Sequence, residues 1–476
     1  MYNISAVNSF NNGYISQIHH SKEVSKTQND KHSAVSSPVQ SYPSLSSSLL
    51  KQISFGNTQM RTSLSSKDEH NKYNEISTII DKKYKKDLQD LLKTGKLLNN
   101  NSNDKTTTLD NLYKIATSER VQGLDKKKIL EEVITTIKYP FIITQKFGDI
   151  PVNLQNDIIN QEKAQGKNIS SMDLDVKSST CPAASIEFNL AHKMPAEFAR
   201  MAEGLTSPKI NVEKTINVKD LSQNFVDIVW MLNEFGADYK FVDWNTLKVN
   251  LKPDRNAIIR ARIQNTYKDR DERSVIDVLM QSTFMNVGAQ NTYDSLIDRR
   301  VPKYNEDDSG LIDIEKNFAE ELATGKGKIC VTYQQIDDNG KLVGYECEPS
   351  ETLQHIQDTL NGGDNVIIGY TYCDSDNNVI GGHEITIIGI ETDKKGNKYF
   401  VCNDTDDGIS DSITYSVDEL LPKIHHAGIP KNVLVNNVEF IEGWKELMQI
   451  YKETRTQNQV QYAVPSNRLT VLNQAA

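Results

Sequence analysis

The stretch SSTCPAASIEF at residues 178–188 places Cys181, the first of five cysteines, directly before Pro182 and a run of helix-forming residues. Proline is tolerated in the first turn of a helix, because the N–H that it lacks would have no partner within the helix. We therefore expect Cys181 at the N-cap or in the first turn of a buried helix. The positive end of the helix dipole favours a thiolate there, and free backbone N–H groups can stabilise an oxyanion. Cysteine acyl-transfer chemistry requires both.

A thiolate nucleophile needs a group that takes up a proton and later donates it to the leaving group, and histidine suits both tasks near neutral pH. His383 has the most suitable context, because it follows Gly381 and Gly382 and opens the strand HEITIIGIE. A strand end bounded by glycine presents the imidazole while the sheet holds the rest of the strand. His192 lies about 16 Å from Cys181 along the same predicted helix, which is out of reach. Three further histidines stand in polar, helix-like or turn-like segments: His355, His425 and His426.

A predicted hairpin supplies the third group of a catalytic triad. The turn at 395–397 returns the chain antiparallel to HEITIIGIE as the segment KYFVCNDTDDG. Asn403 and Asp404 are then expected beside His383. Either side chain can accept the Nδ1 proton and orient the ring.

These segments resemble a known superfamily. Cys181 with PAAS at a helix start, LNGGDNVIIGYTY, GGHEITIIGIE and KYFVCNDTDDG, in that order, are similar to papain-like cysteine peptidases, especially the bacterial branch that includes bacteriocin-leader-processing domains. The resemblance covers roughly residues 170–190 and 355–410. It implies that Cys181 is the nucleophile, His383 the base and Asp404 the orienting residue, with Asn403 as the alternate.

The sequence departs from the superfamily pattern at three points. Pro182 replaces the glycine that usually follows the cysteine. The glutamine that normally precedes the cysteine by a few residues, as an oxyanion donor, has no counterpart; we expect the Cys181 N–H and a hydroxyl of Ser178 or Ser179 to take its place. The interval between Cys181 and His383 is long, so residues 200–310, approximately, are expected to form an inserted helical subdomain or cap.

Predicted helices precede predicted strands between residues 146 and 450, an order typical of an α+β domain. The segment at 327–348 predicts two strands joined at 338–340, NVIIGYTY predicts a buried strand, and the segment at 383–404 predicts two more. The expected fold is papain-like, with the catalytic helix packed on a C-terminal antiparallel sheet.

The two ends of the chain differ in composition from this domain. Residues 1–70 are rich in Ser, Asn and Gln and predict a disordered leader, which also has the composition of a non-cleaved export signal. Residues 71–145 predict a helical region, with an apolar stripe from residue 76 to residue 91 and further helices beginning at Thr107 and Asp125 before Pro140. Residues 451–476 are expected to form a flexible tail.

Composition excludes several classes of function. The net charge is −10, and the basic residues are mixed with acidic ones, which argues against a nucleic-acid partner. The chain has neither an apolar run of about 20 residues nor a secretory signal, so we expect no membrane insertion, and either a cytoplasmic location or export by a signal-independent route. No GxxxxGK[ST] motif occurs, and we expect no cofactor.

The cysteine pattern predicts neither a disulfide framework nor a metal site, since the five cysteines are odd in number and lack a CxxC motif. The oxygen-rich segments DSDNN and DTDDG lack the glutamate of an EF-hand loop and are interpreted as solvated turns. Four cysteines are expected to be structural: Cys330, Cys347, Cys373 and Cys402.

These observations predict a cysteine-dependent hydrolase, a thiol peptidase of bacterial type that cleaves protein or peptide substrates through a thioester acyl-enzyme. Two alternatives stay open. The same triad serves a glutamine deamidase or a transglutaminase-like effector. The missing glutamine and the Cys-Pro junction instead favour a catalytically silent binding module. The oligomeric state is not predicted.

Overall fold

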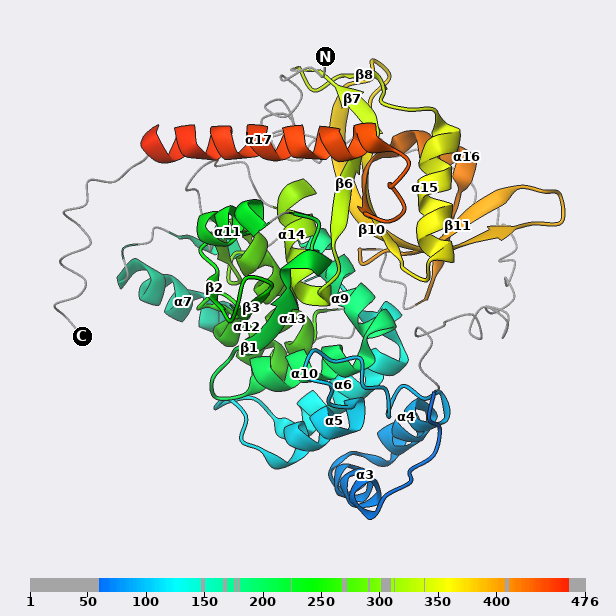
Figure 1. Ribbon diagram of the computed structural model, residues 1–476. Coiled ribbons are helices and arrows are strands. Elements are labelled where there is room, and N and C mark those ends of the chain that lie inside the picture. The colour runs from blue at the N-terminus through cyan, green and yellow to red at the C-terminus, as the bar shows by residue number, and fades with distance from the viewer. Residues whose placement is uncertain are drawn as a thin grey trace, which may run out of the picture.

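The computed structural model describes residues 60–461 except 147–149, 165, 167–168, 175–177, 179, 224, 268–271, 290–291, 301–309, 312, 338 and 407–410. Most of the expected leader and the chain beyond residue 461 lie outside this range. The described chain is an α+β protein with antiparallel sheets, which confirms the predicted class (Figure 1). None of its helices has the length and apolar character needed to span a membrane.

The N-terminal helical region contains four helices where the sequence indicated three. These are α3 (Lys67–Ile79), α4 (Lys82–Lys93), α5 (Thr108–Thr117) and α6 (Lys126–Lys138). The single stripe predicted around residues 76–91 is divided at Ile80, where the backbone becomes extended. Glu131 Oε1 of α6 accepts a hydrogen bond from the Asp81 N–H at 2.7 Å. This bond fixes the segment between α3 and α4 against α6. Helix α3 also begins before residue 70, within the expected leader.

The predicted starts of the later two helices are confirmed. The side chains of Thr107 and Asp125 cap α5 and α6 by accepting backbone N–H bonds from Asp110 and Lys128. Helix α6 ends at Lys138, shortly before Pro140, as expected from the restricted backbone of proline.

The middle of the chain contains a small sheet that the sequence analysis missed. Strands β1 (Val212–Asn217), β3 (Thr246–Leu251) and β2 (Asp238–Phe241) form an antiparallel sheet in that order. The insertion expected at 200–310 is therefore not wholly helical. Buried and more exposed residues alternate along β1 and β3, which is the period of a half-buried strand. The surrounding helices and short strands are α7 (Val152–Ala164), α8 (Ser171–Leu174), α10 (Pro195–Thr206), α11 (Phe225–Glu234), α12 (Ala257–Tyr267), α13 (Val275–Gly288), β4 (Tyr293–Asp294), β5 (Arg299–Arg300) and α14 (Asp313–Thr324).

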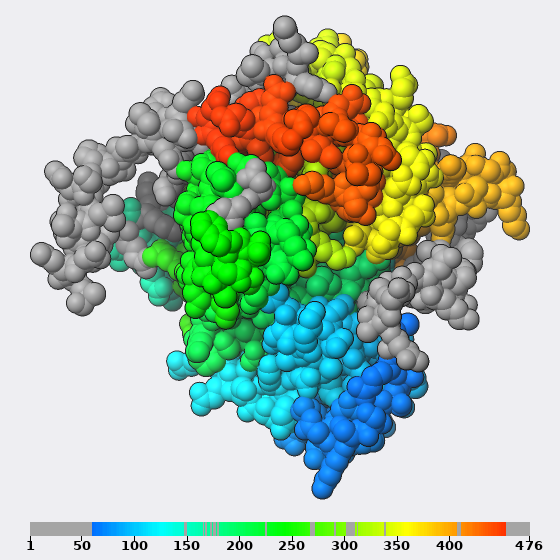
Figure 2. Space-filling model, viewed as in Figure 1, coloured from blue at the N-terminus to red at the C-terminus, as the bar shows by residue number. Residues whose placement is uncertain are grey.

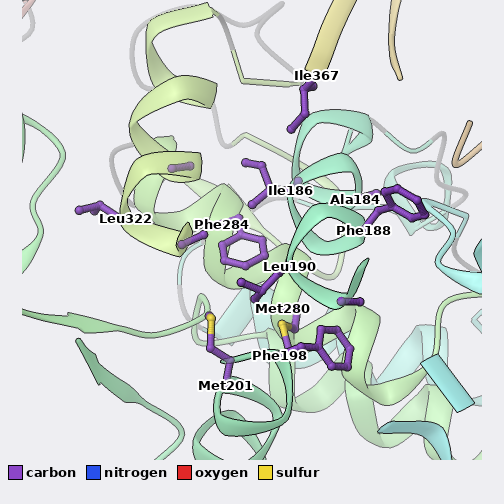
Figure 3. Close-up of a cluster of buried hydrophobic side chains, with 14 of the residues drawn as sticks. Ala184, Ile186, Phe188, Leu190, Phe198, Met201, Met280, Phe284, Leu322 and Ile367 are labelled. Carbon is purple, nitrogen blue, oxygen red and sulfur yellow. The ribbon is translucent and has the colours of Figure 1, made fainter. Parts of the chain in front are cut away.

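Helix α9 (Cys181–Lys193) is buried from Pro182 to His192, as its apolar residues on several faces predicted. It packs against α10, α13 and α14 and against the main sheet. Figure 3 shows Ile186 and Leu190 directed toward Phe284 of α13, with Phe188 on another side of the helix. A helix enclosed in this way holds its first residue in a fixed position.

The main sheet has six antiparallel strands in the order β12-β11-β10-β9-β13-β6. Helices α9 and α14 pack on one side of it and α15 (Pro349–Asn361) on the other (Figure 1). The strands are β6 (Lys328–Thr332), β9 (Val366–Cys373), β10 (Val379–Thr392), β11 (Lys398–Asn403), β12 (Ile413–Ser416) and β13 (Ile424–Pro430). Strand β9, the predicted buried strand, is buried along six consecutive residues, because both faces are covered.

Two of the strand predictions are modified. The β10–β11 hairpin is confirmed, with a turn that uses Gly396 at φ +89°. The strands expected within 327–348 separate into β6, which joins the main sheet, and a hairpin of β7 (Gln334–Ile336) with β8 (Leu342–Tyr345).

Strand β13 overturns one prediction. His425 and His426 do not lie in a polar helix or turn but on this buried strand between β9 and β6. Two consecutive histidines mask the apolar character of the segment, and only pairing with distant strands reveals it.

The C-terminal helix α17 spans Val438–Gln461. The prediction of a flexible tail from residue 451 is therefore wrong for residues 451–461. Tyr451 of this helix is buried and donates its hydroxyl to Glu315 Oε1 at 3.1 Å. Figure 2 shows α17 in red at one end of the molecule and the N-terminal helices in blue at the other. One continuous apolar core includes residues of both.

Candidate active site

Cys181 occupies the first position of α9, as predicted from Pro182. Its side chain is partly exposed, whereas the rest of the first turn is buried. The N-cap residue Thr180 makes no capping bond through its side chain. Its hydroxyl instead accepts a hydrogen bond from Arg273, so the helix start is fixed from outside the helix.

His383 lies on β10, paired with Tyr370 of β9. The prediction that it opens the strand is wrong by a few residues, because β10 begins at Val379 and continues through both glycines. Asp404 and Cys181 are both close enough to the His383 ring to raise its pKa. The sheet and the buried helix therefore bring together two groups that are far apart in the sequence.

Asp404 directly follows β11 and contacts the same ring. Its Oδ1 lies 2.8 Å from His383 Nε2, and its Oδ2 accepts the Tyr415 hydroxyl at 2.9 Å. The backbone N–H of Asp406 also donates to Oδ1 at 3.0 Å. The expected contact through Nδ1 is thus wrong, because Asp404 bonds Nε2 instead.

Asn403 is not brought to the ring. It is the last residue of β11, paired with Thr386, and its side chain is buried. Neither amide atom of that side chain has a hydrogen-bond partner among the residues that the structure describes. Successive residues of an extended chain point in opposite directions, which explains why only one of the two candidates meets His383.

The charges of His383 and Asp404 reinforce each other. Burial lowers the pKa of His383, but its hydrogen bonds to Asp404 and Cys181 outweigh this effect and hold the pKa well above the usual value. Burial likewise raises the pKa of Asp404, and bonds from His383, Asp406 and Tyr415 bring it below the usual range. The site therefore favours an imidazolium next to a carboxylate.

Tyrosines enclose this pair. The Tyr370 ring lies edge-on to the His383 ring, with 5.9 Å between centroids, and its hydroxyl is 2.8 Å from that of Tyr372. Burial and the nearby Asp404 raise the pKa of Tyr415, so its hydroxyl remains protonated and can donate to Asp404. Removal of water around the carboxylate strengthens its interaction with the imidazolium.

A buried arginine holds the residues that precede Cys181 in place through hydrogen bonds. The Arg273 guanidinium pairs with Asp298 through contacts of 3.1 and 3.0 Å. It also donates to Ser178 Oγ at 2.9 Å, to the Thr180 hydroxyl and to the Gln145 carbonyl at 2.5 Å. Ser178, one of the two hydroxyls expected to bind an oxyanion, is thus engaged with Arg273; Ser179 lies outside the described residues.

Gln145 is the site residue that the sequence analysis missed. Its backbone N–H donates to the Thr405 carbonyl at 3.1 Å, and its Oε1 accepts the Thr405 hydroxyl at 3.2 Å. The Gln145 carbonyl and the Thr180 hydroxyl also both accept hydrogen bonds from Arg273. Gln145 is therefore linked both to the residue after Asp404 and to the residue before Cys181. Helices α7 and α8 separate it from Cys181 in the sequence, so no local spacing indicates it.

The other cysteines have surroundings unlike those of Cys181. Burial raises the pKa of Cys330 and Cys402 well above the usual value, and it raises the pKa of Cys347 and Cys373 as well. In the DSDNN segment, Asp374 Oδ1 accepts backbone N–H groups of its own loop at 2.9 and 2.8 Å, as in an Asx turn. Part of DTDDG lies outside the described residues.

Comparisons of this chain with protein-family models, with curated proteins and with solved structures found no match. Its chemistry must therefore be inferred from the geometry of the site.

Proposed function

We propose that this protein is a papain-like cysteine peptidase in which Cys181 is the nucleophile, His383 the general acid and base, and Asp404 the residue that orients the imidazole. One observation carries the proposal: Asp404 at the end of one strand bonds His383 on the neighbouring strand at 2.8 Å, and Cys181 at the helix start is close enough to raise the pKa of the same ring. The arrangement of a buried helix against an antiparallel sheet agrees with the superfamily that the sequence resembles.

The order of steps follows from the groups present. The Cys181 thiolate attacks the carbonyl carbon of the scissile peptide bond, and a tetrahedral oxyanion forms. The His383 imidazolium then donates its Nδ1 proton to the leaving amine as the C–N bond breaks, which produces a thioester and the first product. His383, now neutral, takes a proton from water that attacks the thioester. Collapse of this second intermediate releases the acid and restores the thiolate.

Gln145 is the proposed side-chain donor to the oxyanion, together with the backbone N–H of Cys181. Since Thr405 engages Oε1 of the glutamine, Nε2 is the end of the side chain that a substrate oxygen can use. One donor of this kind contributes about 10²–10³-fold in kcat. Gln145→Ala is expected to lower kcat by that order with a smaller change in KM.

Reaction with a thiol-directed electrophile tests the nucleophile. The full-length protein is treated with a substoichiometric chloroacetamide probe at pH 6–7, and the labelled cysteine is identified by peptide mass spectrometry. Rapid labelling of Cys181 that is lost in His383→Ala supports the proposal. Equally slow labelling of Cys181 and the partly exposed Cys347 and Cys373 would instead indicate an inactive binding module.

Incubation with a peptide library identifies the reaction. New peptide termini that depend on Cys181 are expected. Ammonia release from glutamine peptides without cleavage would overturn the peptidase assignment in favour of a deamidase with the same triad.

A further inference from the structure

A second cluster of polar side chains lies where β13 meets the start of α14. His425 Nδ1 and His426 Nδ1 are 2.8 Å apart, and His426 Nδ1 is 3.2 Å from Asp313 Oδ1. His425 Nδ1 is 4.0 Å from Asp313 Oδ2. One ligand atom from each residue lies within 4.8 Å of the others. Neither the peptidase mechanism nor the sequence analysis uses this cluster, because both histidines were placed in polar segments.

We propose that Asp313, His425 and His426 bind a divalent transition-metal ion, and that Zn²⁺ fits this set of ligands best. Tetrahedral Zn²⁺ with ligand bonds of 2.0–2.1 Å separates its ligand atoms by about 3.3 Å. The two Nδ1 atoms are 2.8 Å apart, and they lie 3.2 and 4.0 Å from the two different oxygens of Asp313, distances on both sides of that value. Two imidazole nitrogens and a carboxylate are ligands that Zn²⁺ commonly takes, with a fourth position for solvent. Asp313 is partly exposed and provides access from solvent.

An irregularity in the β13 backbone directs the imidazoles of His425 and His426 toward Asp313. Consecutive residues of a regular strand face opposite sides of the sheet. In β13, Ile424 pairs with Tyr370 and His426 with Gly369, so one extra residue, His425, interrupts the register. Bulges of this kind redirect side chains. This one allows neighbouring histidines to share Asp313.

Gly369 provides the space for the second ring. A Cβ atom at this position of β9 would lie 2.2 Å from His426 Cε1, which no side chain allows. The β9 backbone and the bulge therefore hold His426 in one orientation. A rigid mount is what a metal ligand needs to keep its geometry.

Glu384 supplies the partner that metal-bound histidines usually have behind them. Its Oε1 lies 2.9 Å from His426 Nε2, on the side of the ring opposite to the cluster. A proton on Nε2 directs the Nδ1 lone pair toward Asp313 and the ion. Glu384 is itself paired with Lys316 at 3.3 Å. Asp313 is the carboxylate that faces both histidine Nδ1 atoms and can bind a cation with them.

Metal binding by the full-length Cys181→Ala protein tests the proposal, since this substitution removes the thiol proposed as the nucleophile from competition for Zn²⁺. The protein is stripped with a chelator, dialysed, and titrated with ZnCl₂ by calorimetry, with zinc content measured by mass spectrometry. One equivalent is expected. Co²⁺ in place of Zn²⁺ should give the visible absorption of a tetrahedral or five-coordinate ion with nitrogen ligands.

Two isosteric substitutions localise the ion. Asp313→Asn removes a ligand charge and is expected to weaken Zn²⁺ binding by at least tenfold. Glu384→Gln removes the group behind His426 and is expected to weaken it by about 10–100-fold. His355→Gln is the matched control, because the ring of this buried histidine bonds Tyr333 and Asn437 and none of the three proposed ligands. It should leave the affinity unchanged.

The alternative is a purely internal hydrogen bond between the two Nδ1 atoms. Absence of stoichiometric zinc and of a Co²⁺ spectrum in the Cys181→Ala protein would establish that alternative and overturn the proposal. Binding that is equally tight in folded Asp313→Asn and in His355→Gln would also overturn it. The Co²⁺ spectrum needs no substitution in the cluster, so the test is independent of whether those variants fold.

Discussion

At the scale of single residues, the two oxygens of Asp404 set the orientation of the His383 ring and favour its protonated form. One holds His383 Nε2 and the other accepts the Tyr415 hydroxyl, so the carboxylate orients the ring and is itself oriented. The neighbouring Asn403, equally close in sequence, is buried away from the ring. We therefore expect the proposed activity to depend strongly on Asp404 and only weakly on Asn403.

Asp404→Asn is expected to lower kcat/KM by about 10²–10⁴-fold, because the neutral amide no longer stabilises the imidazolium that carries the proton. Tyr415→Phe removes one neutral donor to the same carboxylate and should cost about tenfold. Steady-state kinetics on a cleavable peptide measure both. Asn403→Ala serves as the comparison, and an equal loss in that variant would contradict the assignment of Asp404.

In the proposed mechanism, the pKa of His383 sets the alkaline limit of peptidase activity. The ring must be protonated to assist the leaving group, and its pKa is held well above the usual value. Activity should therefore persist above pH 6.5, the usual pKa of histidine, and fall only as the pH rises through the elevated value.

A pH profile of kcat/KM measures this limit. In Asp404→Asn the alkaline limb should move to lower pH, because one of the two hydrogen bonds that raise the pKa loses its negative partner. A limb at the same pH in both proteins would show that the observed ionisation belongs to another group.

At the scale of elements, the start of α9 is held by a buried ion pair rather than by its own cap. Arg273 and Asp298 are both fully buried and join the segments before α9 and α13 to the loop before β5. Removing one member of such a pair leaves a charge without its partner in a region of low dielectric.

Asp298→Asn is expected to lower the free energy of unfolding by about 3–5 kcal/mol and to slow labelling of Cys181. Urea denaturation followed by circular dichroism measures the stability. Glu213→Gln, which breaks the exposed pair with Lys248, should change it by only about 0–1 kcal/mol. Similar losses in the two variants would mean that the buried pair has no special role.

At the scale of the whole molecule, the N-terminal helices belong to the same core as α9 and the main sheet. The apolar cluster that contains Ile134 of α6 also contains Ile186 of α9 and Ile367 of β9. Helix α6 contacts both α9 and α13. We therefore expect these helices to unfold together with the site rather than as an independent unit.

Ile134→Ala should destabilise the protein by about 2–5 kcal/mol, because it leaves a cavity in a fully buried region. Fluorescence of the tryptophans and far-ultraviolet circular dichroism should report one coincident transition. The exposed Val435 provides the control, since its replacement by alanine creates no cavity. Two separate transitions in the Ile134→Ala protein would show that the helices form their own domain.

Local signals in the sequence determined the positions of several elements. Caps at Thr107 and Asp125, the proline after Cys181 and the glycine of the 393–397 turn act within a few residues, so their outcome depends little on the rest of the fold. These signals were sufficient to predict a cysteine at the start of a buried helix and a hairpin that carries His383 and Asp404.

Only the tertiary structure decided which groups meet. The pairing of β13 with β9 and β6 buried two histidines that look polar in sequence. A long-range contact placed Gln145 beside Thr405. The alternation of side chains at the end of β11 directed Asp404 toward His383 and buried Asn403 elsewhere. Contacts between distant segments depend on strand register and packing throughout the core, and no short window of sequence contains that information.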